Sequence, residues 1–202
     1  SAASDVYKRQ QYGSGGSQVA KILAERMGVW CYDRDILTIA AERIGNEELT
    51  EDTINDLNYK RNDVASAGIT GVMGMGNIPI YNQMFLEQAK IIRKLANYGS
   101  AVFLGRCADY ILKDIKNCTS VYLYADREFR KNRVKEIYGS NAEIMDKEEK
   151  NRADYYNYYT GNRWGDINNY DFAINTSKVS FEEAADLIYR FAKDKQKNLK
   201  DR

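Results

Sequence analysis

A glycine-rich stretch directly before a helical pattern constrains this chain more than any other feature. Residues 11–18 contain three glycines and two serines, and residues 19–27 place apolar side chains at helical spacing before Gly28. A turn of this kind gathers unpaired backbone N–H groups at the positive end of a helix dipole, an arrangement that favours phosphate. The alternative is a flexible turn before an ordinary helix, and the rest of the chain has to decide between the two.

The composition excludes several classes of protein. With 30 Lys and Arg residues against 29 Asp and Glu residues, no global charge attracts nucleic acid or a membrane surface. The absence of histidine excludes histidine-based catalysis and the usual zinc sites, and the three cysteines lack C-x-x-C spacing. No apolar run reaches membrane-spanning length, and no secretory signal pattern is visible. We expect a reduced, cytoplasmic, single-domain protein that binds neither nucleic acid nor a membrane.

Apolar runs and helical patterns alternate along the chain. Short strands are predicted at residues 29–32, 101–104, 120–124 and 172–174. Helical patterns lie between them, and Ser180 with Glu183 forms a capping-box pattern before the last helix. This alternation predicts an α/β fold with a mainly parallel sheet flanked by helices, whose ligands bind at the carboxyl ends of the strands. The candidate functional stretches follow predicted strands, at residues 13–17, 33–35, 105–109 and 175–177.

The first ten residues do not fit the strand that should precede a phosphate loop. Such a strand is normally buried and apolar, whereas residues 1–10 are polar. Residues 5–10 read like the translation of a sequencing-library adaptor, so we interpret residues 1–10 as a non-native segment in place of the true first strand. The alternative is a short polar edge strand. If residues 1–10 merely occupy the place of the true first strand, the strand that they form should be short and poor in apolar side chains.

Four stretches, in this order, resemble the cytidylate kinase-like family of P-loop proteins. They are residues 12–16, residues 32–33 with the helix that follows, residues 105–112 and, most specifically, residues 155–166 continuing to 170–171 and 175–177. The resemblance covers nearly all of the chain from residue 11 to residue 202. It implies one domain with the nucleoside monophosphate kinase fold, a substrate-binding insertion at about 36–83 and a lid at about 134–166. It also implies ATP and Mg²⁺ as cofactors and nucleotides as substrates, and it leaves the oligomeric state open.

The phosphate loop departs from the standard pattern G-x-x-x-x-G-K-[ST]. If Gly15 is the last glycine, Gly16 stands where the lysine belongs, and Gln10 replaces the first glycine. Ser17 keeps the hydroxyl position that serves Mg²⁺. The family commonly carries arginine at the positions of Gln10 and Ser17, so the missing cation has to come from elsewhere in the chain or is not supplied.

Residues on both sides of the transferred phosphate follow from the resemblance. We expect the loop to bind phosphate through backbone N–H groups and hydroxyls, and residues 175–177 to run past the adenine. Asp33 resembles the acidic residue that faces the acceptor, with an ordinary helix cap as the alternative. Arg106 can hold the acceptor phosphate with two parallel hydrogen bonds, against a structural salt bridge to Asp109 or Asp126. The residues assigned to ATP are Gly13, Ser14, Gly15, Gly16, Ser17, Asn175, Thr176 and Ser177, and those assigned to the acceptor are Asp33, Arg106 and Asp109.

Arginines of the lid are candidates to close on the transferring phosphate. We prefer Arg152, because it leads into the tyrosine-rich block at 155–159, and we assign Arg106, Arg152 and Asp33 to catalysis. A solvated charged face is the more common role of such arginine runs, and core packing is the more common role of the tyrosines. The lid candidates are Arg130, Arg133, Arg152 and Arg163.

Three functions are compatible with these residues. The first is ATP-dependent phosphoryl transfer to a nucleoside monophosphate, with a CMP-like acceptor favoured. The second is a nucleotide-binding regulatory module that has kept the fold and lost turnover, which Gly16 favours. The third is a kinase of another small metabolite.

Overall fold

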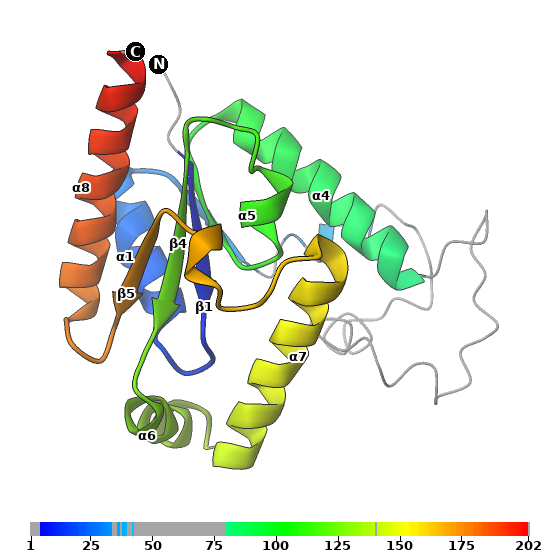
Figure 1. Ribbon diagram of the computed structural model, residues 1–202, viewed down its shortest axis with the longest axis vertical. Helices are drawn as coiled ribbons and strands as arrows, with labels where there is room; N and C mark the ends of the chain where they lie inside the picture. The colour runs from blue at the N-terminus through cyan, green and yellow to red at the C-terminus, as the bar shows by residue number, and fades with distance from the viewer. Residues whose placement is uncertain are drawn as a thin grey trace.

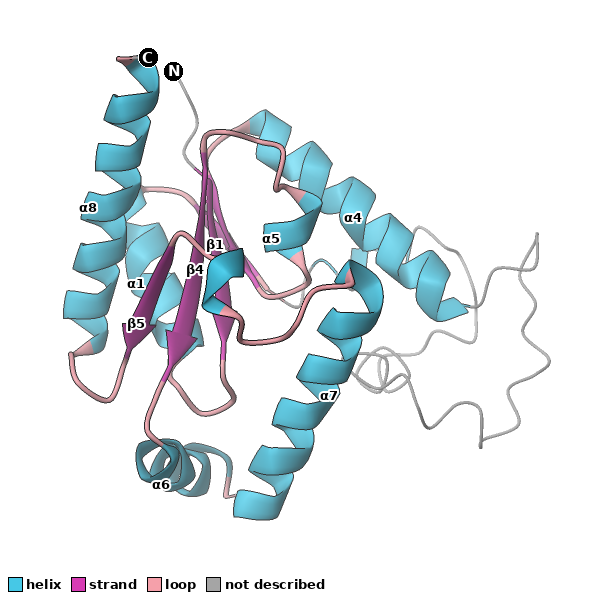
Figure 2. Cartoon of the chain, viewed as in Figure 1, coloured by secondary structure: helices cyan, strands magenta, loops and turns pink. Residues whose placement is uncertain are grey.

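Short apolar runs form the strands of one parallel β-sheet. The structure is a computed structural model that describes residues 5–33, 36, 38–39, 42, 80–139 and 141–201. In this part of the chain the strand order is β2-β3-β1-β4-β5 and every pairing is parallel (Figures 1 and 2). The predicted α/β fold with a mainly parallel sheet is confirmed. The strands are β1 (Asp5–Gln10), β2 (Trp30–Tyr32), β3 (Ala101–Leu104), β4 (Cys118–Tyr124) and β5 (Phe172–Asn175).

The first strand occupies the centre of the sheet. It pairs with β4 from Asp5↔Cys118 to Gln10↔Leu123 and with β3 around Val6↔Val102. The edge-strand alternative is therefore wrong, and β1 is six residues long rather than short. Val6 is fully buried. Backbone hydrogen bonds of a sheet do not depend on side-chain identity, which is how a polar sequence can occupy this position. The non-native origin of residues 1–10 stays a prediction.

Two layers of helices cover the sheet. One layer is α1 (Gly16–Met27) and α8 (Phe181–Lys200), and the other comprises α4 (Ile80–Tyr98), α5 (Ala108–Ile111) and α7 (Ala142–Thr160), as Figure 1 shows. We call α7 the lid helix because it lies within the predicted lid. Because strand residues alternate between faces, Val102 packs with the first layer while Phe103 packs with the second. The helix α6 (Arg127–Tyr138) lies at the carboxyl ends of β1 and β4. The carboxyl ends of the parallel strands, where ligands of such folds bind, therefore lie beside α6.

The last helix begins at the predicted capping box. The Glu183 N–H donates to the Ser180 hydroxyl at 3.1 Å, and the Ser180 N–H donates to the Glu183 carboxylate at 2.8 Å. The Ser180 backbone N–H lowers the pKa of Glu183. This reciprocal pair satisfies two N–H groups at the start of α8 and fixes where that helix begins.

The tyrosine block anchors the lid helix to the second layer. Tyr156 is fully buried, and the ring of Tyr159 stacks on Phe85 of α4 at 4.1 Å between centroids. The Tyr159 hydroxyl also donates to Asn82 at 3.2 Å. The packing role considered for these tyrosines is therefore what the structure shows for Tyr156 and Tyr159. At the other end of α7, Arg127 binds both carboxylate oxygens of Asp146 and ties α6 to the lid helix.

The predicted substrate-binding insertion, 36–83, lies almost wholly outside the described residues. The lid prediction, 134–166, coincides with the end of α6, the whole of α7 and the connection that follows. That connection contains a 3₁₀ turn, η1 (Ile167–Asn169), and passes in front of β4 before entering β5 (Figure 1). Among the helices that the structure describes, none has the length and apolar content needed to cross a membrane.

Candidate functional site

The phosphate loop connects the central strand to the first helix. Gly13 and Gly15 both have positive φ, 80° and 79°, a region that favours glycine. A side chain at Gly13 would lie 2.8 Å from a methyl group of Val134, and one at Gly15 would collide with the ring of Phe181. The loop is therefore held between α6 and α8, and only glycine fits at these two positions. Gly15 is also the N-cap of α1, where no side chain caps the first N–H groups.

The loop borders a cavity of about 210 Å³. Gly13, Gly15, Gly16 and Ser17 line it, as a phosphate site requires. Ser14 is fully buried instead, and its hydroxyl has no hydrogen-bond partner in the described structure. A methyl group at Gly16 would collide with the side-chain amide of Gln10, so Gln10 covers the position where the lysine of a standard loop would begin.

Two arginines from other elements line the same cavity. Arg133 comes from α6 and Arg152 from the lid helix α7. The Arg152 guanidinium lies 5.0 Å from the ring centre of Tyr12 and donates to the Gln10 carbonyl at 3.3 Å. Arg133 donates to the side chain of Gln18 and lies 4.7 Å from the ring centre of Phe181. The positive charge that the loop sequence lacks is therefore present in the cavity.

Arg130 and Glu149 contact the backbone of the phosphate loop at Tyr12. Arg130 is 8% exposed and donates to the Tyr12 carbonyl at 3.4 Å. One oxygen of Glu149 accepts the Tyr12 N–H at 2.8 Å and lies 3.8 Å from Arg130, while the other accepts the Trp164 indole N–H at 3.0 Å. Glu149 is not predicted from the sequence, because it lies in a run of charged residues and contacts a loop residue 137 positions away. No local pattern distinguishes it from its neighbours.

The turn after β5 braces the loop. The hydroxyl of Thr176, a residue 1% exposed, donates to the Ser14 carbonyl at 2.7 Å. Asn175 donates to Asp126 at 3.0 Å and accepts from the Ser177 N–H at 3.0 Å. The Lys178 ammonium, followed by the hydrogen bond from Asn175, lowers the pKa of Asp126 to about 2. The structure thus brings residues 175–177 beside the phosphate loop and the start of α6.

The predicted acceptor residues lie near the end of β3. Arg106 is 3% exposed and has a φ of 58°, so its backbone is in the left-handed region. It lines a small cavity together with Gln10, Arg152 and Trp164. Asp109 accepts a hydrogen bond from the Tyr156 hydroxyl at 3.0 Å. Asp33 follows β2 directly and is half-buried, at the limit of the continuously described chain.

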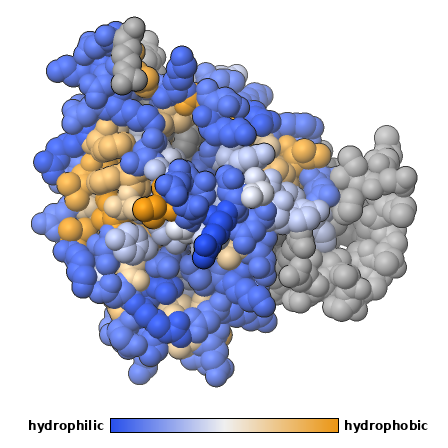
Figure 3. Space-filling model, viewed as in Figure 1, coloured by the Kyte–Doolittle hydropathy of each residue, from blue (hydrophilic) through white to orange (hydrophobic). Residues whose placement is uncertain are grey.

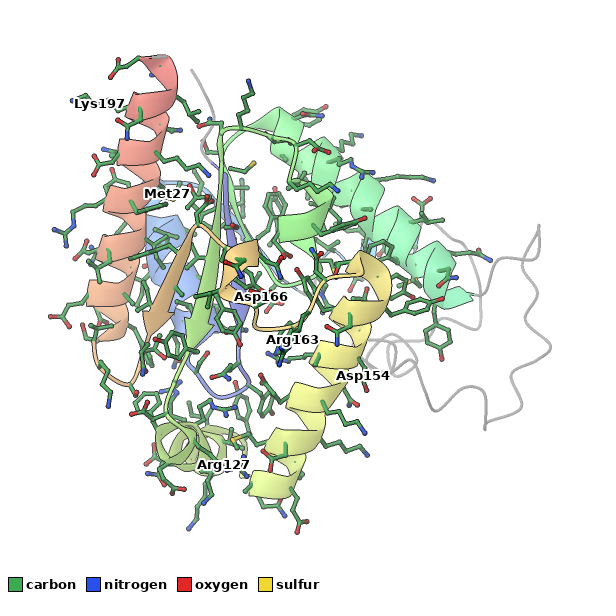
Figure 4. All side chains as sticks on the ribbon, in the orientation of Figure 1. Met27, Arg127, Asp154, Arg163, Asp166 and Lys197 are labelled. Carbon is green, nitrogen blue, oxygen red and sulfur yellow. The ribbon has the colours of Figure 1, made fainter. Side chains whose placement is uncertain are left out.

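The lid candidates separate into two groups. Arg130, Arg133 and Arg152 surround the phosphate loop, and Arg152 alone of these also lines the Arg106 cavity. Arg163 is exposed on the connection after α7, in front of the sheet (Figure 4), and lines none of the cavities described here. Arg152, the preferred candidate, is therefore the arginine placed between the two predicted phosphate positions.

A family model described as the cytidylate kinase-like family matches residues 9–178. The chain belongs to this family. None of the curated proteins matches the chain. The family match begins at Arg9 and ends just after the 175–177 turn, so it includes every candidate site residue named above.

Solved structures with the same fold include kinases of small metabolites. A protein from Eubacterium ventriosum ATCC 27560, described as uncharacterized, is 28% identical with a TM-score of 0.69, and the match covers 94% of this chain and 98% of that one. A gluconokinase from Sinorhizobium meliloti 1021 is 15% identical with a TM-score of 0.53, over 98% and 93% of the two chains. Shikimate kinase from Bacteroides thetaiotaomicron is 12% identical with a TM-score of 0.55, over 95% and 99%. These last two likenesses establish the P-loop kinase fold.

Proposed function

We propose that this chain is an ATP-dependent kinase of a nucleoside monophosphate, with a CMP-like acceptor favoured. The observation that carries the proposal is the position of Arg152, which lines both the phosphate-loop cavity and the Arg106 cavity. Phosphoryl transfer depends on positioning and on neutralising charge between donor and acceptor more than on a special base. A guanidinium shared by the two cavities meets that need.

The donor side fits the polyphosphate of ATP. The uncapped N–H groups at the start of α1 and the helix dipole favour an anion, and Arg133 and Arg152 add two positive charges. No acidic side chain is among the described residues that line this cavity. Ser17 is the candidate protein ligand of Mg²⁺, an ion that normally keeps several water and phosphate ligands. The bound nucleotide would supply the phosphoryl group and Mg²⁺ would neutralise part of its charge.

The acceptor side is assigned to the end of β3. Arg106 offers a planar fork of donors that suits a phosphate group, and the residue is buried, at 3% exposed. Tyr156 orients Asp109, three residues after Arg106 in the chain, by donating a hydrogen bond to its carboxylate. Asp33 is proposed to accept a hydrogen bond from the acceptor or from Mg²⁺-bound water. Asn175 and Ser177 are proposed to make the weak contacts with the adenine.

Two alternatives remain open. A nucleotide-binding module without turnover is favoured by Gly16 at the lysine position and by Glu149, whose carboxylate already binds a loop N–H. A kinase of another small metabolite is favoured by the fold, which the solved gluconokinase and shikimate kinase share.

An ADP-release assay separates the three functions. The assay uses ATP and Mg²⁺ with CMP, UMP, AMP and GMP, and with gluconate and shikimate, alongside a titration of ATP binding. Turnover that is fastest with CMP supports the proposal, and turnover only with gluconate or shikimate supports the metabolite kinase. ATP binding without turnover on any acceptor would contradict the kinase proposal.

The first strand has to be controlled in this assay. We propose that residues 1–10 are non-native, which their polar sequence at the centre of a parallel sheet supports. Resequencing the gene tests this directly. The assay is then run on the chain with the present residues 1–10 and on the chain with the first strand that resequencing reveals. A gene that encodes residues 1–10 as printed would reject the proposal about the segment and leave the kinase proposal unaffected.

A further inference from the structure

A third cavity lies on the face of β4 and β5 that α1 and α8 do not cover. Val121 and Leu123 pack against those helices, and Tyr122 and Tyr124 therefore project from the opposite face. The connection after α7 passes over this face and leaves a groove of about 680 Å³, within the range of small-molecule sites. Figure 3 shows the face of the molecule on which the groove lies. We call it the aromatic groove.

Aromatic rings dominate the wall of the aromatic groove. Tyr122 stacks on Tyr170 at 5.0 Å between centroids and contacts Trp164 edge-on at 6.3 Å. Tyr124 stacks on Tyr122 at 6.2 Å and is 38% exposed, so it offers ring surface to a ligand. Rings arranged in this way bind a planar aromatic ligand by stacking, and nearly any heteroaromatic base is accepted because every base has a π-face.

The charged side chains that line the groove are carboxylates, whereas those that line the phosphate-loop cavity are arginines. Glu149 and Asp171 line the groove, and no lysine or arginine is among its described lining residues. Lys195 compensates Asp171 at 2.7 Å, and Arg130 lies 3.8 Å from Glu149, so the groove is close to neutral with carboxylates at its surface. A phosphate group is disfavoured at such a surface. The lining therefore selects an uncharged ring without a phosphate.

We propose that the aromatic groove is a second ligand site, which binds an uncharged, planar heteroaromatic ring such as that of a nucleoside. The site is separate from the proposed donor and acceptor cavities, because among the described residues it shares only Gln11 with the first and Trp164 with the second. It is nevertheless connected to the phosphate loop. Trp164 donates to Glu149, and Glu149 accepts the Tyr12 N–H, so a ligand in the groove is two hydrogen bonds away from the loop.

The two tryptophans of the chain allow a direct binding measurement. Trp30 is 76% exposed on β2, and the variant Trp30→Phe leaves Trp164 as the only tryptophan reporter. We expect cytidine or adenosine, added without ATP or Mg²⁺, to change the fluorescence of Trp164 saturably. Calorimetry on the unmodified chain supplies the same affinity independently. No saturable change with either nucleoside would overturn the proposal.

Four further variants locate the bound nucleoside. Ala173 is exposed and lines the groove, so Ala173→Phe fills it without disturbing the core, and Tyr124→Ala removes an exposed ring. Tyr124→Ala is expected to weaken nucleoside binding about tenfold, because stacking on one ring accounts for roughly that factor. Ala173→Phe is expected to weaken it because the larger side chain occupies part of the groove. Tyr98→Ala removes a ring that is 82% exposed on α4 and should leave the affinity unchanged. Unchanged affinity in both groove variants would contradict the proposal, as would a loss of binding in Arg106→Ala, which would place the nucleoside in the acceptor cavity. None of these readouts depends on turnover.

Discussion

The phosphate-loop cavity and the aromatic groove meet at Gln11 and have opposite chemistry. The first is lined by glycines and two arginines, and the second by aromatic rings and two carboxylates. Glu149 separates them, since it lines the groove and also binds the loop N–H of Tyr12. Under the proposed function, Arg133 of α6 and Arg152 of α7 supply the positive charge that the loop sequence lacks, while Glu149 and Asp171 line the groove instead.

The largest effect is expected from removing Arg152, the arginine that lines both the phosphate-loop cavity and the Arg106 cavity. Arg152→Ala takes away the guanidinium that lines both phosphate cavities, and we expect turnover in the ADP-release assay to fall by about 10²–10³-fold, the cost of removing one electrostatic contact to a developing charge. Arg163→Ala is the matched control, because Arg163 is exposed and lines neither cavity. An equal loss in both variants would show that lid charge in general, rather than the position of Arg152, supports turnover.

The conformation of the phosphate loop depends on the backbone geometry of its glycines. Gly15→Ala should lower the free energy of unfolding by about 2–4 kcal/mol, because the residue has positive φ and the new methyl group meets the Phe181 ring. Gly28→Ala is the control, since Gly28 also has positive φ but has open space around it, and about 1 kcal/mol is expected. Urea unfolding of both variants measures the difference. Equal losses would mean that the contact with α8 does not constrain the loop.

Neutralising Glu149, which lies between the phosphate-loop cavity and the aromatic groove, tests whether its charge opposes the binding of ATP. In Glu149→Gln the side chain can still accept the Tyr12 N–H, but the negative charge beside the loop is gone and Arg130 loses its neighbouring carboxylate. We therefore expect ATP to bind several-fold more tightly in calorimetry. Glu148→Gln changes the same charge one residue away and is the control. Weaker ATP binding in Glu149→Gln would show that the carboxylate supports the loop rather than opposing the anion.

The smallest expected effect is on stability at acid pH, through Asp126, which contacts the turn after β5. The folded-state pKa of Asp126 is lowered from 3.8 to about 2, so the pair with Lys178 contributes stability above the unfolded value and loses it as the pH falls from about 4 to about 2. Because the pair is exposed, the contribution is small. Asp126→Asn should slightly flatten the acid side of the stability profile, measured by urea unfolding at several pH values. A profile identical to that of the unmodified chain would mean that the pair contributes nothing measurable.

The sequence predicted those elements whose signal is local. The run at Ala101–Leu104 became β3 with the predicted bounds, and the capping box placed the start of α8, because hydrophobic periodicity and caps are short-range patterns. The glycine-rich loop was also found where its spacing indicated. What could not be predicted depends on long-range contacts: Glu149 at the Tyr12 N–H, and the faces of Tyr122 and Tyr124 left open beside β5. Local side-chain pattern does not encode which distant segment packs against a residue.

The central position of β1 in the sheet was also not predictable from its own side-chain pattern. Its polar sequence argued against a buried strand, yet β1 pairs on both sides through its backbone. Its neighbours are β3, whose four residues are all buried, and β4, which is mostly buried. The side-chain pattern of one segment therefore did not decide its place in the sheet.

The central claim, that lid arginines replace the missing lysine at the phosphate loop, is tested most directly by the dissociation constant of ATP. Titration calorimetry compares the unmodified chain with the double variant Arg133→Ala and Arg152→Ala, after circular dichroism has shown that both are folded. Because a hydrogen bond to a charged group contributes about 1.5–3 kcal/mol, we predict that the double variant binds ATP at least about 100-fold more weakly. An unchanged dissociation constant in a folded double variant would contradict the account.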